Sequence, residues 1–275
     1  VEAGRAAHLV HTGVITYPVF ELLLLLRDAP DFEGKPDAAA QAAVRAAMET
    51  ALAYHDGQWR AGPEEGEGHY VGAHQEPAFN GVVLPANRQA AMGRSLWLAY
   101  QLTGKTGYRD KARAIGRYLK HRLSRATDKD AYIWSYNFPL ERTVAAAPWR
   151  ELMEVGVRGE DISHGSLTAS FPMLLYRAGE VFTDEDAGRF AHTVSEVIAR
   201  EGDGVLYTHV DGRPRDSINP GLLVLPSRWL RIAPTDPAVY AALEECLLTR
   251  HEALRPLDLA NLIRYRPTTG QAGAE

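Results

Sequence analysis

The chain has only one cysteine, Cys246, among its 275 residues. A single cysteine excludes an internal disulfide and a metal cluster held by several thiolates. Because Cys246 lies in the mostly apolar run 243–248, it is predicted to be a packed core residue. A chain without disulfides is most typical of the cytoplasm, and a secreted or periplasmic protein with a trimmed N-terminal segment is the alternative.

An excess of positive charge is also absent, since 30 lysines and arginines face 35 aspartates and glutamates. A nucleic-acid-binding surface needs concentrated basic charge, so no nucleic-acid partner is expected. Long hydrophobic runs are lacking too, because the leucine run 22–26 is short and lies between Glu21 and Arg27. The N-terminus shows no basic segment ahead of a long apolar core, so neither a signal peptide nor a membrane partner is expected.

Alternation of apolar and polar residues is scarce, and helical periodicity dominates the chain. Helices are predicted over residues 18–28, 36–55, 85–102, 108–123, 166–178, 184–200, 221–232 and 237–250. They fall into pairs in which a more buried helix precedes a more polar one across a short turn. Four such pairs predict an all-α fold, an incomplete or open (α/α)n toroid of antiparallel helices in a single domain of residues 1–275.

Two segments fall outside this helical pattern. Residues 62–81 are rich in glycine and glutamate and are predicted to form an irregular or hairpin insertion that could act as a lid. This insertion is not a nucleotide-binding loop, because the pattern G-x-x-x-x-G-K is absent. Residues 266–275 are predicted to form a flexible tail.

Proton-transfer groups are most concentrated at residues 160–165, Glu-Asp-Ile-Ser-His-Gly. His164 is the leading candidate for a general base because imidazole titrates near neutral pH, and Asp161 or Glu160 could orient its ring. Glu160 could act as an acid. The start of the helix that follows presents backbone N–H groups that could stabilise an anion. In the alternative interpretation, Asp161 or Ser163 only caps that helix.

Two further clusters supply candidate substrate contacts. Tyr136 could give or take a proton and Trp134 could stack on a sugar ring, with a plain aromatic packing cluster as the alternative. Asn137, next in the chain, is a further substrate-binding candidate. Arg88 could pair with a substrate carboxylate and Asn87 could hydrogen-bond it. An arginine on a solvated face and an asparagine closing a turn is the alternative here.

The remaining histidines do not have the spacing of a zinc site, so no metal site is predicted. His11 and Tyr17 lie close to the first predicted helix. Both are candidates to reach a substrate cleft, as is His74 in the glycine-rich segment.

Short motifs at residues 84–90 (LPANRQA), 102–104 (LTG) with Tyr108, and 134–136 (WSY) carry a family resemblance. The chain resembles the carbohydrate-active α/α-toroid superfamily, and within it the C-terminal catalytic domain of D-glucuronyl C5-epimerases and the toroidal polysaccharide lyases. The resemblance extends over roughly residues 10–250 and consists of helix rhythm and short motifs.

This resemblance implies a cleft for an acidic sugar and removal of the proton alpha to a uronate carboxylate. A lyase then eliminates the glycosidic oxygen, whereas an epimerase returns a proton to the opposite face. Arg88 and Asn87 would neutralise the carboxylate. His164, oriented by Asp161, would remove the proton, and Tyr136 would protonate the leaving group or the opposite face. The implied partner is a small-molecule or oligosaccharide substrate, and no redox or nucleotide cofactor is implied.

Three other functions stay open at this point. The first is glycoside hydrolysis with Glu160 or Asp161 as the acid. The second is a natural-product biosynthetic cyclase that reuses the toroid, and the third is a non-catalytic module whose concave face docks a partner. A homo-oligomer that supplies the missing helix pairs is also open.

Overall fold

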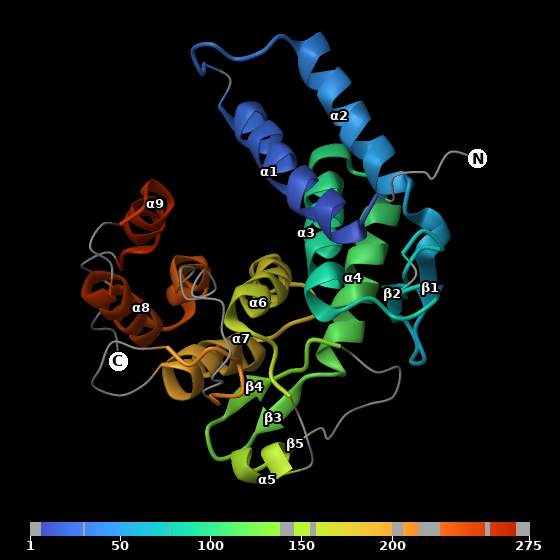
Figure 1. Ribbon diagram of the computed structural model, residues 1–275. Helices are drawn as coiled ribbons and strands as arrows, with labels where there is room; N and C mark the ends of the chain where they lie inside the picture. The colour runs from blue at the N-terminus through green and yellow to red at the C-terminus, as the bar shows by residue number, and fades with distance from the viewer. Residues whose placement is uncertain are drawn as a thin grey trace. The chain divides into compact units, whose positions relative to one another are not determined.

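In the computed structural model (Figure 1), 62% of the described residues are helical and 11% are strand. It describes residues 7–29, 31–76, 78–137, 146–154, 158–199, 206–213, 226–250 and 254–267. The strands form one two-stranded and one three-stranded sheet. The prediction of an all-α fold is therefore wrong, and the described helices show no toroid. The strands escape prediction because each has two or three residues, too few for alternation to be recognised.

The chain divides into two compact units, named here unit 1 and unit 2. Unit 1 comprises residues 1–121 and 137–141, and unit 2 comprises residues 122–136 and 142–275. Both units bury aromatic and aliphatic side chains, for example Phe20 in unit 1 and Trp134 in unit 2. The single domain over residues 1–275 stays a prediction.

Unit 1 is built around helix α3, most of which is buried. The helices of the unit are α1 (Leu9–Asp28), α2 (Ala38–Ala53), α3 (Ala86–Thr103) and α4 (Thr106–Lys120). Both α1 and α4 pack against α3. Gly13 lets α1 approach α3 closely, because a Cβ atom at this position would lie 2.4 Å from the carbonyl carbon of Ala91.

Helix α1 is buried on one side only, although its apolar sequence predicts burial nearly all round. Phe20 and Leu23 face the core, whereas Ile15 and Leu25 are 61% and 63% exposed. Among the described residues, α1 is also the helix whose length and apolar composition would suit a membrane span. Core helices of soluble proteins and signal sequences share these properties, so α1 does not assign a location.

A hairpin follows α2 in unit 1. β1 (Trp59–Ala61) pairs antiparallel with β2 (Gly68–Tyr70), and Trp59 lies opposite Tyr70. A turn of 3-10 helix, Asp56–Gln58, leads into β1. The hairpin therefore begins ahead of residues 62–81, where the irregular or hairpin insertion is predicted.

Unit 2 combines a small sheet with helices. Its strands, in the order β4-β3-β5, are β3 (Ser124–Ala126), β4 (Ala131–Ile133) and β5 (Ala146–Ala147). Its helices are α5 (Trp149–Glu154), α6 (Ile162–Arg177), α7 (Asp184–His192), α8 (Pro237–Arg250) and α9 (Pro256–Tyr265). β3 pairs antiparallel with β4 and parallel with β5.

Several helix predictions in unit 2 need correction. The helix predicted at 184–200 is α-helical only as far as His192 and continues as a π-helical turn, Thr193–Ile198. In place of the α-helix predicted at 221–232, Pro226–Arg231 form a 3-10 helix, and residues 221–225 lie outside the described residues. Helices α5 and α9 are not among the predicted elements. Most of the predicted tail also lies outside the described residues.

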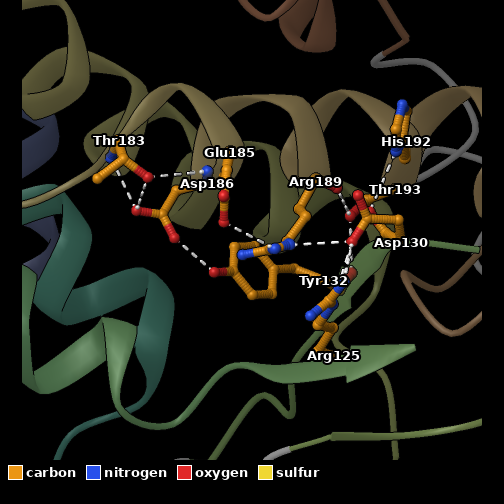
Figure 2. Close-up of polar contacts among 9 residues, drawn as sticks. All are labelled: Arg125, Asp130, Tyr132, Thr183, Glu185, Asp186, Arg189, His192 and Thr193. Carbon is orange, nitrogen blue, oxygen red and sulfur yellow. Dashed lines mark hydrogen bonds and ion pairs between the residues drawn. The ribbon is translucent and has the colours of Figure 1, made fainter. Parts of the chain in front are cut away.

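A buried polar network joins α7 to the sheet of unit 2 (Figure 2). The carboxylate of Asp186 accepts hydrogen bonds from the Tyr132 hydroxyl at 2.5 Å and from Thr183 N at 2.7 Å. Thr183 Oγ1 accepts from Asp186 N in return, which completes a capping box. Burial, together with the hydrogen bond to Asp186, raises the pKa of Tyr132 to about 12. Tyr132 belongs to β4, so this carboxylate anchors the start of α7 to the sheet.

Replacing Asp186 by alanine should lower the free energy of unfolding of unit 2 by about 2–4 kcal/mol. The substitution leaves the buried Tyr132 hydroxyl and the Thr183 N–H without their acceptor. Urea unfolding followed by tryptophan fluorescence measures the change. The matched control is Glu185→Ala, which removes a neighbouring carboxylate whose side chain is 78% exposed. The control should change stability by less than about 0.5 kcal/mol, and equal effects of the two variants would contradict the anchoring role.

Candidate acid–base site in unit 2

Three short segments of unit 2 lie side by side and carry the candidate site. Residues 159–161 form the middle segment, with residues 134–135 on one side and residues 208–210 on the other. The backbone N–H of Glu160 donates to the carbonyl of Trp134 at 3.0 Å, and the carbonyl of Glu160 accepts from Val210 N at 2.9 Å. Because side chains alternate along an extended chain, Glu160 and Asp161 point to opposite faces of this ladder.

Glu160 points into the core and is fully buried. Its Oε2 accepts hydrogen bonds from Trp134 Nε1 and Thr168 Oγ1, both at 2.7 Å. Its Oε1 has no hydrogen-bond partner among the described residues. Burial raises the pKa of this carboxyl to about 8, and the two hydrogen bonds only partly oppose the effect. Glu160 is therefore mostly protonated at neutral pH.

Asp161 is the N-cap residue of α6 and holds the ring of His164. Its Oδ1 accepts from Ser163 N at 3.0 Å and from His164 N at 3.1 Å. Its Oδ2 lies 2.5 Å from His164 Nδ1. One carboxylate thus caps the helix and orients the imidazole at the same time. The side chain of His164 is 44% exposed, so the ring is accessible from outside.

The electrostatics of this pair favour an ionised carboxylate. Burial alone would raise the pKa of Asp161, but hydrogen bonds from His164 and Ser163 outweigh it and hold that pKa well below the ordinary range. An ionised carboxylate at Nδ1 favours the tautomer that carries its proton on Nδ1. The basic nitrogen of His164 is then Nε2, the ring atom that does not contact Asp161.

Two more aromatic side chains border the Asp161–His164 pair. The ring centroid of Tyr136 lies 5.3 Å from that of His164, in an edge-on arrangement. His209 forms an antiparallel bridge with Asp161, so the two side chains project to the same face of the ladder. In the sequence, His209 ends the short stretch Leu-Tyr-Thr-His at residues 206–209. Nothing local marks it, because its place beside Asp161 comes from pairing between distant segments.

Asp211 is a second residue that the sequence does not single out. It is fully buried, and its Oδ2 accepts from Gly159 N at 2.8 Å and pairs with Arg213 Nη2 at 3.0 Å. These contacts fix the start of the middle segment and hold a guanidinium near it. In the sequence, the pair Asp211-Gly212 predicts only an ordinary turn. Nothing local therefore indicates that Asp211 binds Gly159 and Arg213.

The expected anion-stabilising role of the α6 start is wrong. The N–H groups of residues 163 and 164 donate to the Asp161 side chain. Gly165 N donates to the Asp161 carbonyl at 2.7 Å, and Ile162 N donates to Thr208 O at 2.9 Å. The first four N–H groups of the helix are therefore already bonded within the protein and cannot stabilise an enediolate.

The predicted carboxylate-binding residues lie in unit 1. Arg88 Nη1 pairs with Glu76 at 2.8 Å, and the guanidinium lies 4.2 Å from the ring centroid of Phe79. Asn87 is 3% exposed, and its Oδ1 has no hydrogen-bond partner among the described residues. An internal carboxylate thus already pairs with the arginine that the sequence assigns to the substrate.

The other predicted substrate contacts also belong to unit 1. His11 packs edge-on against a neighbouring histidine ring at 5.3 Å, and the ring of Tyr17 lies 4.2 Å from the guanidinium carbon of Arg94. His74 and Asn137 line two hollows of unit 1. Of the predicted site residues, the structure brings together those at positions 134, 136, 160, 161 and 164, all in unit 2.

Within the described parts of the chain, no group of three or more histidine, cysteine, aspartate or glutamate side chains could hold a metal ion. No family model, curated protein or solved structure matches the chain. The resemblance to epimerases and lyases stays a prediction, and function has to be argued from the site itself.

The raised pKa of Glu160 predicts a pH-dependent stability. This pKa is about 8 in the folded protein and near 4.3 in an unfolded chain. Between these values the folded state keeps a proton that the unfolded state has lost, so rising pH favours unfolding. The free energy of unfolding should fall by up to about 1.4 kcal/mol per pH unit over this window and level off above about pH 8.

Urea titrations of unit 2 between roughly pH 5 and pH 8 test this dependence. Glu160→Gln keeps an acceptor for Trp134 and Thr168 but cannot ionise, so its stability should vary less with pH than that of the wild type. Glu185→Gln, at an exposed position of α7, is the control and should keep the wild-type slope. A Glu160→Gln variant with an unchanged slope would show that Glu160 does not titrate in this range.

Proposed function

We propose that unit 2 carries an acid–base site that removes the proton alpha to the carboxylate of a uronate-type sugar or a related polar acid. The reaction would be that of a lyase or an epimerase. The observation that carries the proposal is the 2.5 Å contact between Asp161 Oδ2 and His164 Nδ1 at an accessible position. A carboxylate that orients an imidazole is the usual arrangement for a histidine base.

In the proposed reaction, His164 Nε2 takes the proton from the substrate. The positive charge that forms on the imidazole is balanced by Asp161, whose lowered pKa keeps it ionised. The pair therefore separates two tasks, since one residue moves the proton and the other holds the ring and stabilises its charged form.

Tyr136 supports a second proton-transfer role. It is half-buried, and its ring meets that of His164 edge-on. In a lyase the phenol would protonate the departing glycosidic oxygen, and in an epimerase it would return a proton to the opposite face of the alpha carbon. His209, on the same face of the ladder as Asp161, is the other group that could serve there.

A substrate carboxylate needs a cation to lower the pKa of its alpha proton. Within unit 2 we assign this task to Arg213, whose side chain is 36% exposed and is held by the buried Asp211. The Nε and Nη2 atoms of Arg213 both contact Asp211 Oδ2, at 3.1 and 3.0 Å, and this ion pair fixes the place of the guanidinium in unit 2. Arg88, the residue that the sequence favours, lies in unit 1 and pairs there with Glu76.

Glu160 acts in this proposal as a positioning residue. Its Oε2 links Trp134, two residues before Tyr136, to Thr168, one helical turn after His164. The buried carboxyl therefore holds together the two segments that carry the proton-transfer groups.

Glycoside hydrolysis is the second candidate function, and the pKa of Glu160 favours it. A hydrolase needs a carboxylic acid that is still protonated at the working pH, and the pKa of about 8 meets that need. Full burial and two internal hydrogen bonds argue against direct contact between Glu160 and a glycosidic oxygen. We therefore place hydrolysis second.

The setting proposed for this activity is the cytoplasm, because a chain with one cysteine gains nothing from an oxidising compartment. The proposed partner is a soluble small-molecule or oligosaccharide acid.

Incubation with uronate oligosaccharides distinguishes the candidate reactions. A lyase produces an unsaturated uronate whose enol-ether absorbance rises with time. An epimerase incorporates deuterium from D₂O at the alpha carbon without cleaving the chain. New reducing ends without ultraviolet absorbance would contradict both and identify a hydrolase.

With whichever uronate substrate turns over, His164→Ala should lower kcat/KM by about 10²–10⁴-fold, the usual contribution of a general base. Asp161→Asn should also lower it, because the amide cannot hold the reactive tautomer. His192→Ala is the matched control, since His192 contacts the Asp130 carbonyl at 3.1 Å on another part of unit 2. Full activity in a folded His164→Ala variant would exclude the proposed mechanism.

A further inference from the structure

Unit 1 contains a hollow beside the β1–β2 hairpin. Its volume is about 800 Å³, within the range of small-molecule sites. Most of its described wall is apolar, formed by Ala61, Val71, Ala78, Phe79, Val82 and Val83. The polar groups that line it are Arg60, His69 and Asn137.

A second hollow of about 450 Å³ adjoins the first, because Arg60, Val71 and Gly81 line both. The second hollow has a more polar wall. Its side chains with hydrogen-bonding groups include Gln58, His74, Gln75 and Asn80. The two hollows therefore offer an apolar region and a polar region that meet at one arginine.

Arg60 supplies the positive charge at this junction. Its Nη1 donates to the carbonyls of Gly57 and Trp59 at 2.9 and 2.7 Å, and no carboxylate of the described residues pairs with it. The described walls of both hollows contain no aspartate or glutamate. A guanidinium whose internal partners are only carbonyls keeps its charge available to an anionic ligand.

The wall that carries Phe79 is held in place by a buried ion pair. Glu76, with a side chain only 2% exposed, pairs with Arg88 at 2.8 Å, and Arg88 stacks on Phe79 at 4.2 Å. The backbone of the same stretch is closed by hydrogen bonds from Phe79 N to Glu76 O at 2.8 Å and from Gly72 N to Val82 O at 2.8 Å. Such a wall is organised before any ligand arrives, which favours binding.

We propose that the two hollows form one binding site for an amphipathic organic anion. The charged group of the ligand pairs with Arg60, and its apolar body lies against Phe79 and Val82. Polar substituents reach the amides of the second hollow. This site lies in unit 1 and does not depend on the acid–base reaction proposed for unit 2.

Fluorescence titration of the full chain with 1-anilinonaphthalene-8-sulfonate, an aromatic anion of suitable size, tests the site. Saturable binding to the folded protein is expected. Arg60→Gln should weaken it by about tenfold, the effect of losing one charge-assisted hydrogen bond. Arg60→Lys should retain part of the affinity. Arg45→Gln, at an exposed position of α2, is the matched control and should bind like the wild type.

Two comparisons locate the bound probe. N-phenyl-1-naphthylamine has the same aromatic body without the sulfonate, and it should bind about tenfold more weakly. Val82→Asp places a repelling charge at a wall residue that is 56% exposed, whereas Leu25→Asp places the same charge at a residue of α1 that is 63% exposed. Only Val82→Asp should weaken binding.

Several results would overturn the proposal. They are an absence of saturable binding, equal affinity of Arg60→Gln and wild type, equal affinity for the uncharged analogue, and loss of binding with Leu25→Asp instead of Val82→Asp. Circular dichroism of each variant shows that the fold is retained, so a change in affinity reports on the site.

Discussion

The buried carboxyl of Glu160 is the constraint on which the candidate site of unit 2 depends. A polar side chain without solvent must find partners, and this one takes both of its hydrogen bonds at a single oxygen, from Trp134 and Thr168. Those two residues belong to the segments that carry Tyr136 and His164. The two hydrogen bonds to this one oxygen therefore hold two distant parts of the chain in a defined arrangement.

The neighbouring Asp161 uses the opposite face of the same short segment. Its carboxylate accepts hydrogen bonds from the N-terminus of α6 and orients His164. The same side chain therefore both caps the helix and holds the proposed base. Adjacent carboxyls with opposite surroundings then have pKa values shifted in opposite directions, upward for Glu160 and downward for Asp161. Such a division is typical of sites that move protons.

Much of the helical content could be predicted, because α3 and α6 show long apolar patterns and α4 an amphipathic one, with clear ends such as Gly104. The strands could not be predicted, because residue pairs such as Arg125 and Tyr132 are set by pairing between segments. The strands are too short to show an alternation of apolar and polar residues. The Asp161–His164 spacing also predicted proximity, because residues three apart at a helix start lie on one side. Arg88 looked equally available in sequence, and only the fold shows Glu76 beside it.

Local sequence predicted a helix just after residues 160–165, a cap at Asp161 or Ser163, and a carboxylate within reach of His164. The structure begins α6 at Ile162, ahead of the start predicted at residue 166, and makes Asp161 its N-cap. These local features follow from backbone geometry over a few residues. The tertiary structure decided which groups are buried and what they meet. It placed His209 beside Asp161 and made Glu160 a neutral acid, because burial and pairing depend on segments far apart in the chain.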